Sequence, residues 1–199
     1  MNIAEVVDFV YKTIKPLPNQ KAQEKRLEAA LALAQELEAQ GWTFEVRIAQ
    51  NEVWHLICIT PMITFSGDDL SASSRYEIRV TNGLSNPQVK ALDRENGWPS
   101  PHPHVNWNNI PCLGSQAEMI CLYEPFILVQ GIANMMAGEI TQGDEYYYMG
   151  NYVPWEYCAS CYVKVAVSQA EEEGGLFYHP DCLEYKKKEI TDNAGIKEA

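Results

Sequence analysis

The sequence is poor in basic residues, and one long stretch of it has none. Its 199 residues contain 15 lysines and arginines against 27 aspartates and glutamates, a formal net charge of −12. No lysine or arginine lies between Arg94 and Lys164. We therefore expect no binding to nucleic acid and none to an anionic membrane surface, because both depend on basic side chains. The N-terminal residues 1–26 are instead net basic, because they contain five basic and three acidic residues.

Long apolar runs and a secretory leader are also missing. The most apolar stretch, residues 117–138, is interrupted by Glu118, Glu124 and Pro125, so we expect no membrane span. Without a leader the expected location is cytoplasmic, where the six cysteines would stay reduced and would serve metal binding or catalysis. The hydrophobic fraction of 46% is enough for a folded core.

Hydrophobic periodicity predicts helices first and strands afterwards. Apolar residues recur every three or four positions in residues 3–14 and 20–40, which predicts two helices. From Trp42 the period changes to two, and residues 42–48, 53–59 and 76–80 read as antiparallel strands. This order is typical of an α+β domain.

A long irregular segment follows the strands. Residues 93–116 contain four prolines, which prevent a continuous helix or strand, and interleaved apolar residues that predict a packed loop. Trp98 and Trp107 are expected to form the core of this loop. Pro125 then suits the first turn of a helix that runs to about Glu139.

The C-terminal cysteines have the spacing of a zinc site. Cys158-x2-Cys161 is followed after 17 residues by His179-x2-Cys182, two close pairs of donors that fit the tetrahedral Cys₃His set of structural Zn²⁺. The pattern resembles a LIM-type or treble-clef finger. A thioredoxin-like redox pair would leave His179 and Cys182 unexplained, and three separately buried cysteines are the other alternative.

A second motif surrounds Cys112. The stretch from Pro101 to Gly114 contains His102-Pro103 and, ten residues after the histidine, Cys112-Leu113. Here the sequence resembles the ubiquitin-conjugating enzymes, in which a His-Pro-Asn tripeptide precedes the acceptor cysteine at this spacing. The N-terminal helix, the strand meander, the proline-led strand at residues 87–90 and the step Tyr123-Glu124-Pro125 occur in the family's order. The resemblance covers residues 20–140.

The resemblance implies both a fold and an activity. The fold would be ubiquitin-conjugating-enzyme-like, with an N-terminal helix, a meander, an active-site loop and a following helix. Cys112 would accept a ubiquitin-like modifier as a thioester from an activating enzyme and pass it to a lysine amine. The family docks its activating enzyme on the first helix, although the basic cluster between Lys12 and Arg26 also suits a solvated face. The zinc module would bind a ligase, the target or the modifier, or would brace the domain.

The sequence departs from the family at two positions of this loop. His104 stands where the family has the asparagine that supports the oxyanion, and Asn109 replaces the usual glycine before the cysteine. His104 is the first candidate for the oxyanion donor, and Asn106, Asn108 and Asn109 are the others. These departures indicate a divergent member, of the kind of the prokaryotic relatives encoded beside a ubiquitin-like modifier.

Other functions remain open for these residues. The main rival is a non-catalytic adaptor of the same fold that binds a ubiquitin-like protein, and a hydrolase with a Cys112–His104 dyad is the third possibility. His102 is expected to fix the loop by hydrogen bonds, while Cys58 and Cys121 are expected to pack. The expected organisation is a conjugating-enzyme-like domain at 1–145, a zinc module at 146–190 and a polar tail at 191–199.

Overall fold

The computed structural model describes residues 1–14, 17, 19–49, 53–67, 69–82, 86–93, 98, 100–112, 124–137, 152–153 and 155–195.

The chain begins with two helices, and the predicted ranges match both closely. Helix α1 spans Ile3–Thr13 and starts with a capping box between Asn2 and Glu5. Helix α2 spans Gln20–Ala39, and Gly41 follows it with a φ of 94°, a conformation that suits glycine.

The meander forms one antiparallel sheet with a hairpin inserted into it. Strands β1 (Thr43–Ile48), β2 (Trp54–Ile59), β5 (Tyr76–Thr81) and β6 (Gln88–Ala91) pair in the order β1-β2-β5-β6. Between β2 and β5 the chain forms a separate two-stranded sheet from β3 (Ile63–Gly67) and β4 (Leu70–Ser74). The turn of this hairpin includes Asp69 in the left-handed region, at a φ of 61°.

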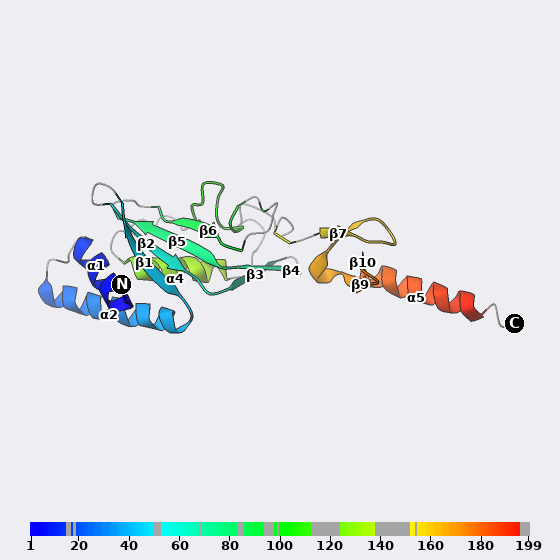
Figure 1. Cartoon of the computed structure of the whole chain (residues 1–199), viewed down its shortest axis with the longest axis horizontal. Helices are drawn as coiled ribbons and strands as arrows, with labels where there is room; N and C mark the ends of the chain where they lie inside the picture. Colours follow the sequence, from blue (N-terminus) through cyan, green and yellow to red (C-terminus); the bar gives the residue numbers. More distant parts are fainter. Residues whose placement is uncertain are drawn as a thin grey trace.

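One face of the sheet packs against the helices. Alternate strand residues such as Leu56, Ile78 and Val89 are fully buried and share one core with α1, α2 and helix α4 (Pro125–Met136). Figure 1 shows these helices on the same side of the four strands. The opposite face carries charged residues of β5 and β6. The mixed α+β class predicted from the sequence is therefore confirmed.

The C-terminal part forms a separate small module at one end of the molecule (Figure 1). It contains a hairpin of β7 (Trp155–Tyr157) and β8 (Lys164–Ala166), the 3₁₀ turn η3 (Val167–Gln169), a second hairpin and helix α5 (Pro180–Gly195). The second hairpin pairs β9 (Glu171–Glu173) with β10 (Leu176–Tyr178) through Gly174 and Gly175, both at positive φ as a tight two-residue turn requires.

Two features of this part differ from the expected organisation. Helix α5 extends to Gly195, so the first five residues of the expected polar tail are helical. The segment before β7 does not belong to the small module, because Tyr152 and Val153 are buried in the main core. Strand β8 joins the two parts, since Ala166 packs in the main core and Val165 packs beside Cys158. The expected boundary at residues 145–146 lies outside the described residues.

Within the described residues, no helix has both the length and the apolar character needed to cross a membrane.

Candidate functional sites

The structure brings the four predicted metal ligands together. The Cys158, Cys161 and Cys182 sulfurs and a His179 ring nitrogen all lie within 4.8 Å of one another. Cys158 follows β7, Cys161 lies in the turn after it, His179 follows β10, and Cys182 lies in the first turn of α5. The distance from the Cys161 sulfur to His179 Nδ1 is 3.5 Å. This set can hold one metal ion.

Backbone hydrogen bonds set the positions of the ligands. The Cys158 amide donates to the Val163 carbonyl at 3.0 Å, and the Tyr162 amide donates to the Cys158 carbonyl at 2.9 Å. Tyr162 has a φ of 61°, which turns the chain sharply after Cys161. At the second pair, the Cys182 amide donates to the His179 carbonyl at 3.0 Å as the helix begins. Each pair of ligands is therefore held by its own tight turn.

The surroundings shift the pKa values of two of these thiols in opposite directions. Burial raises the pKa of Cys158, but hydrogen bonds from the backbone of Cys161, His179 and Ser160 outweigh it and lower the pKa to about 5. Burial and the neighbouring Cys161 and Cys158 sulfurs raise the pKa of Cys182 to about 11. The site thus favours the thiolate of Cys158 and disfavours that of Cys182. A divalent cation supplies the positive charge that several thiolates need at this distance.

The loop around Cys112 is a short hairpin. Val105 and Pro111 form an isolated antiparallel bridge. The Cys112 amide donates to the His104 carbonyl at 2.8 Å, and the Asn106 amide donates to the Ile110 carbonyl at 3.0 Å. The Cys112 side chain is exposed. The loop therefore presents a solvent-accessible thiol at one end of an ordered hairpin.

Asn106 shapes the tip of this hairpin. Its side-chain oxygen accepts hydrogen bonds from the amides of Asn108 at 2.9 Å and Ile110 at 3.0 Å. Asn109 follows at a φ of 64°, a conformation that asparagine tolerates better than most residues. The Asn109 carbonyl accepts from the Val89 amide of β6 at 2.8 Å, which ties the loop to the sheet.

His102 connects the loop to the end of helix α4 by hydrogen bonds. The side chain is fully buried, its Nδ1 accepts from the His104 amide at 3.1 Å, and Nε2 lies 3.0 Å from the Met136 carbonyl at the end of α4. These partners assign the neutral tautomer with the proton on Nε2. Burial, followed by the neighbouring His104, lowers the pKa of His102 to about 3. The expectation that His102 fixes the loop by hydrogen bonds is confirmed.

His104 lies between the buried anchor and the cysteine. Its ring is half-buried and stacks against the His102 ring with centroids 5.7 Å apart. Its carbonyl accepts from the Cys112 amide, so its backbone is fixed relative to the thiol.

Three other expectations have different outcomes. Trp98 is buried as predicted, but Trp107 is 78% exposed at the tip of the hairpin, so its assignment to the loop core was wrong. The turn made by Asn106 leaves the next side chain pointing to solvent. Cys58 is fully buried in the main core, as predicted, and burial raises the pKa of its thiol. Cys121 and Leu113 lie outside the described residues.

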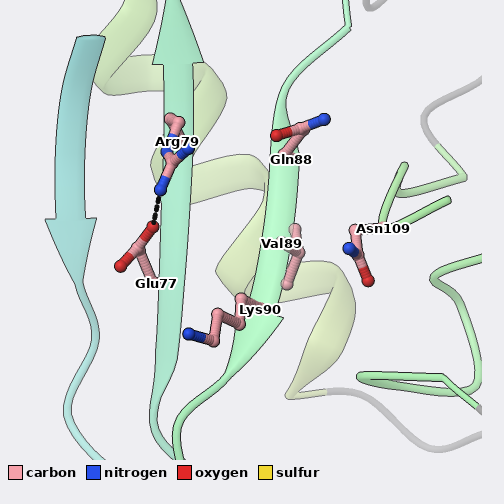
Figure 2. Close-up of a pocket in the computed structure, with 6 residues that line it drawn as sticks. All are labelled: Glu77, Arg79, Gln88, Val89, Lys90 and Asn109. Atoms are coloured by element: carbon pink, nitrogen blue, oxygen red, sulfur yellow. Dashed lines mark hydrogen bonds and ion pairs between the residues drawn. The ribbon is translucent and has the colours of Figure 1, made fainter.

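A shallow groove borders the loop. It has a volume of about 150 Å³ and lies between the hairpin and the solvent-facing side of β5 and β6. In Figure 2, Asn109 of the loop lies beside Val89 of β6, while the Lys90 side chain points away from Asn109, toward β5. Arg79 Nη2 and Glu77 Oε1 form an ion pair at 2.6 Å on β5. Arg79 and Lys90 are the cationic side chains among the residues that line this groove.

The chain shows no significant match to any protein-family model, curated protein or solved structure.

Proposed function

We propose that this protein is a ubiquitin-conjugating-enzyme-like acyltransferase that carries a ubiquitin-like modifier as a thioester on Cys112. The observation that carries the proposal is the exposed Cys112 thiol at the end of an ordered loop whose anchor is the buried His102. The order of helices, antiparallel meander, loop and following helix α4 supports a conjugating-enzyme-like fold.

The proposed chemistry consists of two acyl transfers. The Cys112 thiolate attacks the carbonyl carbon of the thioester on the activating enzyme, a new C–S bond forms, and the activating enzyme's cysteine leaves as a thiolate. A lysine amine of the target then attacks the same carbonyl carbon. The Cys112 thiolate leaves, the amine gives up its proton to solvent, and an isopeptide bond remains.

Each tetrahedral intermediate needs a hydrogen-bond donor for its oxyanion. We assign this role to His104, because its backbone is hydrogen-bonded to Cys112 and its ring is only half-buried. A well-placed donor contributes about 3 kcal/mol to such a transition state. Asn106 is the weaker candidate, because its side-chain oxygen already organises the turn.

The basic N-terminal cluster suits the docking of an activating enzyme only in part. Lys12, Lys21 and Lys25 are exposed on α1 and α2. Arg26 instead is buried and forms an ion pair with Glu124 at 2.8 Å, next to the start of α4. A docking surface on these helices would therefore use the lysines, and Arg26 would hold α2 to α4.

For the C-terminal module we propose a structural zinc ion held by Cys158, Cys161, His179 and Cys182. Four protein ligands leave no coordination position for a substrate, so this zinc would fold the module and would not act in catalysis. The module's own core supports this role because its fully buried hydrophobic members are few. They are Cys158, Val165, Tyr178 and Leu183.

A thioester assay tests the acyltransferase proposal. The protein is incubated with ATP, a ubiquitin-like modifier and its activating enzyme, and the products are separated with and without reductant. We expect a thiol-labile adduct with the wild type, none with Cys112→Ala, and a thiol-resistant ester with Cys112→Ser. Cys58→Ala is the matched control, because this buried cysteine cannot reach a partner, and it should behave as the wild type.

The same assay distinguishes the acyltransferase from a non-catalytic adaptor. Stable binding of the modifier, without an adduct from a demonstrably charged activating enzyme, would overturn the acyltransferase proposal in favour of a non-catalytic adaptor.

A further inference from the structure

Tyr152 enters the main core beside the cysteine loop, although it lies in the segment that leads to the metal module. The side chain is fully buried. Its ring contacts Trp98 and Phe65 edge-on, with centroids 5.2 and 5.8 Å apart. Phe65 in turn lies 4.3 Å from the His102 ring. The C-terminal segment therefore packs against the same aromatic cluster that surrounds the loop anchor.

A hydrogen-bond relay connects the Tyr152 hydroxyl to the loop. The hydroxyl of Ser100 donates to the His102 carbonyl at 2.8 Å, so its single proton is used there. The short hydrogen bond between Tyr152 and Ser100 must then have the tyrosine hydroxyl as donor. Both hydroxyls are buried, and a buried hydroxyl that loses its partner is costly.

The relay continues from His102 to Cys112 through the backbone. The Val105 amide donates to the same His102 carbonyl at 2.8 Å, and Val105 pairs with Pro111 next to the cysteine. The His104 amide donates to the His102 ring, and the His104 carbonyl accepts from the Cys112 amide. The hydrogen bonds therefore form a continuous chain from the Tyr152 hydroxyl through Ser100, His102 and His104 to the Cys112 amide.

We infer that Tyr152 is a positioning residue for Cys112, by which the segment before the metal module holds the acceptor loop in place. The inference rests on the proposed function for its catalytic meaning, but the structural link stands on the contacts themselves. Strand β8 strengthens this link. It places Ala166 in the main core and Val165 beside Cys158, so the module is fixed to the core at a second point.

The test compares two buried tyrosines that each donate one hydrogen bond. Tyr152→Phe removes the hydroxyl from the relay. Tyr11→Phe is the matched control, because the Tyr11 hydroxyl donates to Glu124 Oε2 at 2.8 Å, away from the relay. Amide hydrogen exchange at Cys112 and His104 reports loop order, and single-turnover thioester formation reports the reaction. Ser100→Ala breaks the same relay one residue further on and replaces Tyr152→Phe if that variant does not fold.

We expect Tyr152→Phe and Ser100→Ala to speed exchange of the Cys112 amide about tenfold, as loss of one buried hydrogen bond allows. Thioester formation should slow in both, while Tyr11→Phe changes neither rate. Unchanged Cys112 exchange in both relay variants, or an equal effect of Tyr11→Phe, would overturn the inference. If the relay variants free the Cys112 amide but the wild type forms no thioester, the proposed function fails and Tyr152 still positions the loop.

Discussion

The buried His102 makes the stability of the protein depend on pH in a specific range. Its pKa is about 3 in the folded state, because burial disfavours the charged ring, against about 6.5 for an unperturbed histidine. Between these values the unfolded chain binds a proton at this residue and the folded chain does not. The free energy of unfolding therefore falls as the pH is lowered below about 6.5.

The size of this effect follows from the two pKa values. Well between the two values each pH unit costs about 1.4 kcal/mol for one proton, and half of that at pH 6.5, so lowering the pH from 6.5 to 4.5 removes about 2 kcal/mol. That is a large part of the stability of a typical domain. Other groups also titrate in this range, among them the Cys158 thiol with a pKa of about 5, so the wild type must be compared with a variant that lacks only the His102 titration.

The assay measures urea unfolding of the wild type and His102→Gln at several pH values. The variant loses hydrogen bonds and should be less stable at pH 7 by about 2 kcal/mol. Because glutamine does not titrate, the stability advantage of the wild type should fall by about 1.4 kcal/mol per pH unit between pH 6 and 4, so it passes through zero and the variant becomes the more stable protein near pH 4. A difference that stays constant over this range would show that His102 is not held neutral in the folded state.

Three further predictions concern other parts of the molecule. Glu124→Gln should lower the unfolding free energy by about 3 kcal/mol, more than Arg26→Met, because it leaves a guanidinium that is 4% exposed beside a neutral amide; equal losses would contradict this. Asn106→Asp keeps the acceptor of the turn and removes the amide donor, so thioester formation should persist, whereas His104→Ala should slow it about 100-fold. A chelator should release close to one zinc per chain and speed amide exchange throughout residues 155–188, while β2 and β5 stay protected; metal-free protein with a protected module would refute the structural role.

Local patterns were sufficient to predict much of this fold. The ranges of α1 and α2 follow from helical periodicity and from an asparagine before each helix, and Gly41 follows the end of α2. Pro125 indeed begins α4, since a helix tolerates proline in its first turn. The clustering of Cys158, Cys161, His179 and Cys182 was predictable because the spacing of the two pairs limits how they can be arranged, and the structure brings all four together.

Features that depend on contacts far apart in the sequence could not be predicted in this way. Arg26 reads as one of a basic cluster, and only the packing of α2 against the start of α4 shows that it is buried beside Glu124. Trp107 reads as a core residue, since nothing local shows that Asn106 uses its side chain to turn the chain. Tyr152 falls inside the expected zinc module, and its place beside Ser100 in the main core depends on residues about 50 positions earlier.

The central claim is that Cys112 accepts an acyl group, and intact-protein mass spectrometry tests it most directly. After reaction with a charged activating enzyme and quenching without reductant, we expect the protein to gain the mass of one modifier minus one water. Peptide mapping should place this increment on Cys112, and dithiothreitol should remove it. An unmodified Cys112 in the presence of a charged activating enzyme, or an increment that maps to another residue, would contradict the account.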